Sequence, residues 1–202
     1  MILKRQINSF FHSNTYFLFS EEELTAWIID PGDVKNILQT IAGYRLEGVL
    51  LTHTHFDHIY GLNELMEVYP DVKVYTSSFG KRGLYDPQLN LSSYQDGDDY
   101  VYHYENVIEL KEGEIVAAID QLNLEVMETP GHDESCLSYK IGDYLFTGDA
   151  FIPFVKVVTS FPHSNKKMAL ESMDRIQNCM PNTLLCPGHG ECVLRDELDR
   201  QG

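Results

Sequence analysis

The stretch of sequence that decides the fold is Thr52-His53-Thr54-His55-Phe56-Asp57-His58. It places three imidazoles and a carboxylate in adjoining positions, directly after the apolar run 48–52, which has the length of a buried strand. A continuing strand would send His53 and His55 to the same face, because side chains alternate along a strand. A helix that begins near Ile59 would carry Asp57 and His58 in its first turn. The four side chains could then converge at the carboxyl end of the strand.

Imidazole and carboxylate ligands suit zinc, iron or manganese, and a structural zinc site would contain thiolates as well. The alternative is a polar turn in which Asp57 caps the helix, which is typical of segments with one histidine. Because this segment has three histidines, we interpret it as metal-binding.

Three later segments share one pattern, in which a strand is followed by glycine and then by a side chain that can bind metal. They are Thr129-Pro130-Gly131-His132, Phe146-Thr147-Gly148-Asp149 and Cys186-Pro187-Gly188-His189-Gly190. Glycine permits the sharp turn and close backbone approach that such a position needs. Each segment alone is more typical of a turn with a hydrogen-bonded histidine. Together with the first stretch they predict one site.

The ordered set H-x-H-x-D-H, G-H, G-D and G-H-G resembles that of the metallo-β-lactamase fold hydrolases, over residues 52–190. The resemblance implies an α/β (α+β) fold, a four-layer αββα sandwich with two metal ions at one edge between the sheets. By the family pattern, His53, His55 and His132 bind the first metal. Asp57, His58 and His189 bind the second, and Asp149 bridges both.

The charges of this ligand set agree with hydrolysis. Asp57 and Asp149 are anionic and the five imidazoles are neutral, so two divalent ions leave the site positive. A positive site lowers the pKa of bound water towards neutrality, and no serine or cysteine nucleophile is needed. The resemblance implies attack by a metal-bridging hydroxide, with Asp57 as the catalytic residue that orients it. Zinc is the expected metal, with iron and manganese as alternatives.

Within the family the chain is most similar to the short, single-domain, glyoxalase II-like branch, which implies a thioesterase acting on substrates such as hydroxyacylglutathione. In the zinc-dependent lactamases a cysteine occupies the position matched here by Asp149, so β-lactams are disfavoured as substrates. Asp133 replaces the usual threonine, and the sequence stops soon after Gly190 without the helical domain that binds glutathione. Recognition of glutathione is therefore left open. The alternatives are a lactonase and a persulfide dioxygenase-like oxidoreductase with a single iron at the first site.

Several other residues could lie near the site. Phe151, Phe154, Val155 and Phe161 follow the bridging aspartate and could line an acyl pocket, although burial in a core is the more common role of apolar residues. Cys192 could lie near the metals, but we expect a buried thiol. The remaining histidines lack the strand-glycine context and are not expected to bind metal: His12, His103 and His163.

Composition limits the remaining possibilities. With 202 residues, 43% of them hydrophobic, the sequence predicts one domain over 1–202. A net charge of −16 excludes nucleic acid as a partner and disfavours anionic membranes. No apolar run is long enough to span a bilayer and no signal peptide is evident, so we expect a cytoplasmic protein with reduced cysteines and a small-molecule substrate. The oligomeric state is left open.

Periodicity and turn residues predict alternating elements. Helices are expected at 33–42, with Asp33 as N-cap, and at 59–69 and 166–180. Residues 86–105 are expected to form a long surface excursion. Strands are expected at 14–20, 24–30, 48–52, 72–76, 107–110, 114–118, 122–129, 135–141, 144–147 and 183–186.

Overall fold

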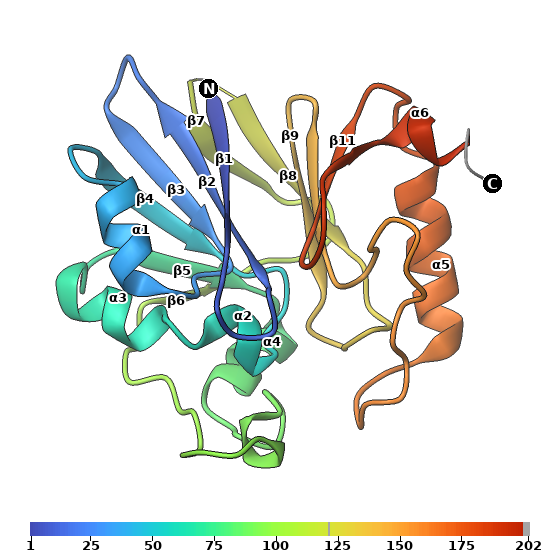
Figure 1. Ribbon diagram of the computed structural model, residues 1–202, viewed down its shortest axis with the longest axis horizontal. Coiled ribbons are helices and arrows are strands. Elements are labelled where there is room, and N and C mark those ends of the chain that lie inside the picture. Colours follow the sequence, from blue (N-terminus) through green and yellow to red (C-terminus); the bar gives the residue numbers. More distant parts are fainter. Residues whose placement is uncertain (121, 200–202) are drawn as a thin grey trace.

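The computed structural model describes residues 1–120 and 122–199, and within them two six-stranded sheets face each other (Figure 1). The first sheet has the order β1-β2-β3-β4-β5-β6, antiparallel among β1, β2 and β3 and parallel from β3 to β6. Its strands are β1 (Ile2–Ile7), β2 (Asn14–Ser20), β3 (Thr25–Ile29), β4 (Arg45–Leu50), β5 (Lys73–Thr76) and β6 (Val107–Glu109).

The second sheet has the order β12-β11-β10-β9-β8-β7 and is antiparallel except for the parallel pair β10 and β11. Its strands are β7 (Ile115–Ile119), β8 (Leu122–Glu128), β9 (Leu137–Ile141), β10 (Tyr144–Gly148), β11 (Leu184–Pro187) and β12 (Val193–Leu194).

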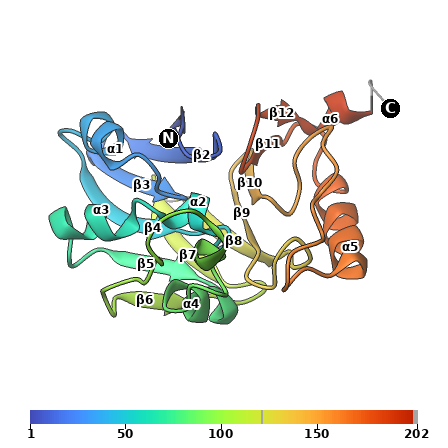
Figure 2. The ribbon, with the colours of Figure 1, turned by 60° about the horizontal axis from the view of Figure 1, so that its bottom comes forward.

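Helices cover the outer face of each sheet, so the predicted αββα sandwich is confirmed (Figure 2). Helices α1 (Val34–Thr40) and α3 (Leu62–Val68) lie over the first sheet, and α5 (Lys166–Gln177) lies over the second. The short helices are α2 (Phe56–Ile59), α4 (Ser78–Leu84), α6 (Arg195–Leu198) and the 3-10 turn Ser92–Tyr94. Among the described residues, no helix is long and apolar enough to cross a membrane.

Alternation along the strands produces these layers. Along β2, Phe17 and Phe19 pack outward with α1 and α3, whereas Tyr16 and Leu18 pack inward against the second sheet. On the far side, Leu145 and Leu185 pack with Ile176 of α5. Three apolar interfaces between four layers therefore account for the fold.

Some expected elements differ in extent. Strand β4 ends at Leu50, so His53 and His55 lie in the loop after it and not on a strand as predicted. Asp33 occupies the N-cap position of α1 but makes no capping bond, because its carboxylate accepts from Ser9 and from the Tyr60 hydroxyl. Helix α5 ends at Gln177, before the predicted residue 180.

The segment 86–105 is not only a surface excursion. Asn90 is fully buried and its side chain donates to the carbonyls of Gly83 and Tyr100, which fixes the segment on the first sheet's side of the molecule. Elements with short or polar sequences were not predicted: β1, α4, β12 and α6.

Candidate metal centre

The candidate site lies where the carboxyl ends of four strands meet. The loop after β4 carries the first histidine cluster, β8 is followed by His132, β10 by Asp149, and β11 by His189. Parallel strands bring their carboxyl ends to the same edge, and the two sheets bring their edges together. Helix α2 begins inside the cluster, so Asp57 and His58 lie in its first turn as predicted.

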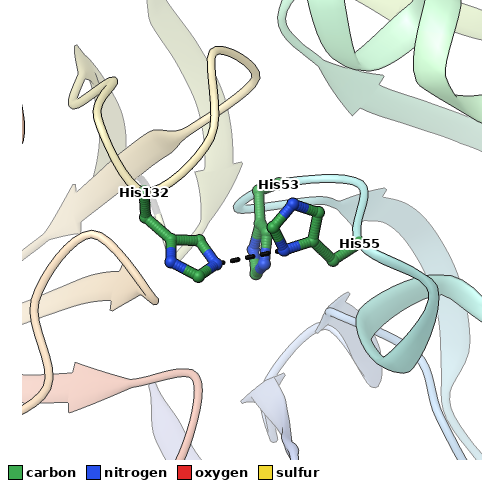
Figure 3. Close-up of side chains that lie close together, drawn as sticks. All are labelled: His53, His55 and His132. Atoms are coloured by element: carbon green, nitrogen blue, oxygen red, sulfur yellow. Dashed lines mark hydrogen bonds between the residues drawn. The ribbon is translucent and has the colours of Figure 1, made fainter. Parts of the chain in front are cut away.

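The structure brings the seven predicted residues together. His53, His55 and His132 form one group whose ring nitrogens lie within 4.8 Å of one another. Figure 3 shows these three rings, which come from opposite sides of the site, with His132 Nε2 3.0 Å from His55 Nδ1. His53 is fully buried and the other two are nearly so.

Asp57, His58 and His189 form the second group, within the same limit of 4.8 Å. His58 Nε2 lies 3.2 Å from His189 Nε2, and Asp57 Oδ2 lies 3.2 Å from His189 Nε2. Asp149 lies between the groups: its carboxylate is 3.7 Å from His132 Nε2 on one side and 3.4 Å from His189 Nε2 on the other. Asp149 is therefore close to a histidine of each group.

Two buried atoms test whether these residues fit metal ions. Among the described residues, His53 Nε2 and Asp149 Oδ1 are buried without a hydrogen-bond partner, although both are strongly polar. An unpaired buried polar atom is costly, and native proteins rarely leave one unexplained. Both atoms belong to the converging donor set, so the site fits cations bound by imidazole and carboxylate.

Glycine makes this convergence possible. A Cβ atom on Gly188 would lie 2.1 Å from Asp149 Oδ1 and 2.8 Å from His58 Cε1. Gly148 has a φ of +50°, and a Cβ there would lie 2.3 Å from the Thr52 hydroxyl oxygen. A larger residue at Gly188 would therefore displace the candidate ligands Asp149 and His58, and one at Gly148 would displace Thr52, which contacts Asp30 and His53.

Outer partners orient four of the five imidazoles. His58 Nδ1 lies 3.1 Å from Asp30 Oδ2, His132 Nδ1 lies 2.9 Å from the Val158 carbonyl, and His55 Nε2 lies 3.4 Å from Asp133 Oδ2. His53 Nδ1 lies 3.2 Å from the Thr52 hydroxyl oxygen. Such partners fix the ring orientation and raise the basicity of the nitrogen that faces a metal.

Asp30 was missed by the sequence reading. It is buried, with a φ of +54°, and accepts from the Thr52 backbone at 2.8 Å and from the Thr52 hydroxyl at 2.6 Å. Its signal in the sequence is weaker than that of the predicted residues: the carboxylate directly follows an apolar strand, but the glycine, Gly32, comes after it and not before it.

Burial and neighbouring charges shift the pKa values in opposite directions within the site. Burial and the surrounding histidines hold the pKa of His53 well below its usual value, and burial lowers that of His132. For His58, burial lowers the pKa, but the charges of Asp57 and Asp149 outweigh it and raise the value to about 10. Burial likewise opposes ionisation of Asp57, yet His58 and His189 hold its pKa below the usual range.

A cavity of about 370 Å³ opens onto both groups. Its polar wall contains His55, Asp57, His132, Asp149 and His189. Apart from Gln95, the rest of its lining is apolar: Phe10, Phe11, Phe56, Leu91, Ile152, Val155, Val158 and Phe161. None of the described residues that line the cavity is Lys or Arg.

Of the four candidate pocket residues, two line the cavity, one lies in the core and one is exposed elsewhere. Val155 and Phe161 line the cavity, and the Phe161 ring stacks edge-on against His55 with centroids 5.2 Å apart. Phe151 is buried under α5, and Phe154 is exposed outside this cavity. The lining residues missed include Phe10 and Phe11, because nothing near them in sequence carries a metal-binding pattern.

The histidines that were set aside lie outside both groups. His163 stacks on Phe79, and no metal-binding group of described residues contains His12, His103 or His163. Cys192 is half-buried beside Tyr16, with its Sγ 3.6 Å from the Tyr16 hydroxyl.

Comparison with known proteins supports these observations. The family model described as the metallo-beta-lactamase superfamily matches residues 9–189. A probable metallo-hydrolase of Bacillus subtilis is 33% identical over 88% of this chain and 85% of its own. A hydroxyacylglutathione hydrolase of Pectobacterium carotovorum is 27% identical over 87% of this chain, which spans 61% of that protein.

Two solved structures are similar over nearly the whole chain. The crystal structure of the BLEG-1 B3 metallo-beta-lactamase has a TM-score of 0.90 and 25% identity, and covers 98% of this chain and 97% of its own. That of ETHE1 from Myxococcus xanthus has a TM-score of 0.78 and 28% identity, covering 99% of this chain and 82% of its own.

Proposed function

The chain belongs to the metallo-β-lactamase superfamily, and from that membership we propose that it is a dinuclear metal-dependent hydrolase that cleaves a small ester-like bond, with a thioester as its substrate. The observation that carries the proposal is the convergence of two three-residue groups and Asp149 beside an apolar cavity. The hydroxyacylglutathione hydrolase relative supports the choice of a thioester.

We assign His53, His55 and His132 to one ion, Asp57, His58 and His189 to a second, and Asp149 to both. Zinc is the expected metal, although iron and manganese suit the same ligands. Two bound divalent ions would supply a hydroxide nucleophile at neutral pH and would polarise the carbonyl oxygen of the substrate.

The chain's own residues position the reactants. Asp57 lines the cavity and is ionised at neutral pH, so its carboxylate can accept a hydrogen bond from the attacking water and orient it. The apolar wall, including Phe161 and Val155, holds the organic part of the substrate and keeps bulk water away from it. Because this wall carries no described Lys or Arg, we expect neutral thioesters to be better substrates than glutathione thioesters, which carry carboxylates.

Replacing Asp149 tests the assignment. Asp149→Ala removes the carboxylate that faces both groups, so we expect it to lose at least one ion and to reduce thioester hydrolysis by several orders of magnitude. The matched control is Asp143→Ala in the exposed turn between β9 and β10, which should retain metal content and activity. Metal analysis and steady-state kinetics measure both effects. Full activity of Asp149→Ala would overturn the mechanism.

The same purified protein separates the competing substrates. Neutral aryl thioesters, S-lactoylglutathione, acyl-homoserine lactones and a chromogenic β-lactam are compared by kcat/KM. The likeness to BLEG-1 makes the β-lactam a necessary arm, even though Asp149 stands where the zinc-dependent lactamases are expected to carry cysteine. Faster turnover of a lactone or a β-lactam than of any thioester would replace the thioesterase assignment.

A second candidate is a persulfide-oxidising enzyme with a single iron ion. The compact group His53, His55 and His132 could serve such a site without the second group, and the likeness to ETHE1 fits it. One iron per chain in protein from its native host, together with oxygen uptake on addition of a persulfide, would favour this candidate over the hydrolase.

A further inference from the structure

Two thiols flank the loop that carries His189. Cys186 lies on β11, and Cys192 directly precedes β12. These two antiparallel strands pair Leu184 with Leu194 and Leu185 with Val193. One more step in this register sets Cys186 opposite Cys192.

The hydrogen-bond pattern shows which kind of pair this is. The Arg195 backbone N–H donates to the Thr183 carbonyl at 2.8 Å, so Thr183 and Arg195 form a hydrogen-bonded pair. Pair types alternate along an antiparallel ladder, so Cys186 and Cys192 fall in a non-hydrogen-bonded position, where Cα atoms are about 4.5 Å apart and side chains are closest. A disulfide spans Cα distances of about 4.4–6.8 Å, so the position suits one.

Both sulfurs point to the same side of the sheet. Cys186 is fully buried in the core between the two sheets, and Cys192 packs against that core while remaining partly exposed. The accessible thiol and the buried thiol therefore face each other, an arrangement in which one can react with an external agent and the other can resolve the product.

The surroundings favour the thiolate of Cys192. The neighbouring Cys186 thiol holds the pKa of Cys192 below its usual value against the opposing effect of burial, and the Tyr16 hydroxyl and the Arg5 charge act in the same direction as Cys186. Arg5 is itself held at this loop by the Gly190 carbonyl and by Glu191, 2.6 Å away. By contrast, burial raises the pKa of Cys136 well above its usual value.

We propose that Cys192 and Cys186 are an oxidation site that forms a disulfide across the two ends of the His189 loop, with a low-molecular-weight disulfide as oxidant. The Cys192 thiolate attacks the oxidant, whose S–S bond breaks and releases one thiol. Cys186 then loses its proton, attacks the Cys192 sulfur and releases the second thiol. Two protein thiols and one external disulfide thus become one protein disulfide and two external thiols.

The bond closes a ring over residues 186–192. The loop inside it is already held by the Asn14 side chain, which donates to the Pro187 and Gly190 carbonyls at 2.9 Å each. Closing the ring restricts the loop further, so we expect His189 to release a bound ion more slowly. This consequence rests on the proposed role of His189 as a ligand, whereas the formation of the disulfide does not.

Peptide mapping by mass spectrometry tests the pairing on the metal-loaded protein equilibrated with oxidised glutathione. The expected product is a Cys186–Cys192 bond with the loss of two hydrogens, reversed by dithiothreitol. Cys192→Ser should abolish it, and Cys179→Ser is the matched control that should leave it intact. Cys186→Ala keeps the attacking thiol without the resolving one, so it should accumulate a glutathione adduct on Cys192.

Three outcomes would overturn the proposal. The first is that Cys192 does not react, and the second is that a glutathione adduct on Cys192 persists in the unaltered protein. The third is a disulfide from Cys186 or Cys192 to Cys136 or Cys179. None of these readouts depends on hydrolysis, so they remain informative if no thioester is cleaved. The effect on the loop is measured as the rate of metal loss to a chelator, and equal rates in the oxidised and reduced forms would remove the consequence for His189.

Discussion

At the scale of single residues, the candidate ligands depend on side chains that hold their outer nitrogens. Asp30 and Asp133 each present a carboxylate oxygen to one imidazole, and a backbone carbonyl serves a third. Asp133 is itself fixed by Ser135, whose backbone N–H and hydroxyl both donate to Asp133 Oδ1. Burial raises the pKa of Asp133, but hydrogen bonding and charge from His55 hold it below the usual value.

Asp133→Asn tests this arrangement at the position where the family resemblance led us to expect threonine. The amide keeps the shape but loses the charge that orients and polarises His55, so we expect metal affinity to fall by about 10- to 100-fold. Competition with a chromophoric chelator measures it. Asp143→Asn, an exposed change of the same type, should leave the affinity unaltered. An unchanged affinity in Asp133→Asn would mean that the His55 contact has no role in binding.

At the scale of elements, the second sheet depends on one covering helix. Helix α5 begins after Asn165, whose side chain accepts from the backbone N–H groups of Lys167 and Met168. Its inner face carries Ile176 into the cluster with Leu145 and Leu185, on the strands that lead to Asp149 and His189. Packing by α5 therefore supports two of the loops that carry candidate ligands.

Ile176→Ala tests how strongly α5 supports the sheet. Removing a fully buried branched side chain leaves a cavity, and we expect a loss of about 2–5 kcal/mol in the free energy of unfolding. Leu170→Ala lies on the same helix with 57% of the side chain exposed, and should change the stability by less than about 0.5 kcal/mol. Urea unfolding followed by circular dichroism compares the two. Similar losses in both variants would show that burial does not set the cost.

At the scale of the whole molecule, the site connects the two sheets. The segment after β4 of the first sheet supplies His53 and His55 from its loop and Asp57 and His58 from α2. The loops after β8, β10 and β11 of the second sheet supply His132, Asp149 and His189. Bound ions would thus join halves of the structure that otherwise meet through apolar packing.

Removal of metal should therefore lower global stability. A ligand present at about 100 times its dissociation constant stabilises a fold by about 2.7 kcal/mol. We expect the thermal midpoint to fall after dialysis against a chelator and to return when zinc is restored. Differential scanning calorimetry follows the cycle, with Asp149→Ala as a reference whose midpoint should shift less. A midpoint that is unaffected by the chelator would contradict metal binding between the sheets.

The net charge of −16 is also a property of the whole molecule. It repels anionic substrates, and no described Lys or Arg in the cavity lining offsets that repulsion. The kcat/KM for the anionic S-lactoylglutathione should rise as salt is added, because screening weakens the repulsion. A neutral thioester is the control and should respond little. If kcat/KM for the anionic substrate fell as salt is added, that would indicate a cationic binding site.

Local patterns were sufficient to predict strands with a clear apolar run and the candidate ligands that follow a strand and a glycine. Strand β2 was predicted at its observed bounds because each of its residues is either apolar or a strand-end polar residue. Strand β1 was missed because its faces are half-exposed, and β12 because it has two residues. Asp30 was missed because its role comes from contact with His58, which lies 28 positions later.

The motifs of the sequence identified the seven residues that converge, because residue type and spacing are local features, and they carried the resemblance to the family that implied the layered fold. Only the tertiary structure decided which nitrogen of each ring faces inward, which outer carboxylate orients it, and that Phe10 and Phe11 complete the cavity. It also decided that Cys186 and Cys192 stand opposite each other, since strand register is a property of paired strands. These are contacts between residues distant in the chain, and no local pattern encodes a distance between them.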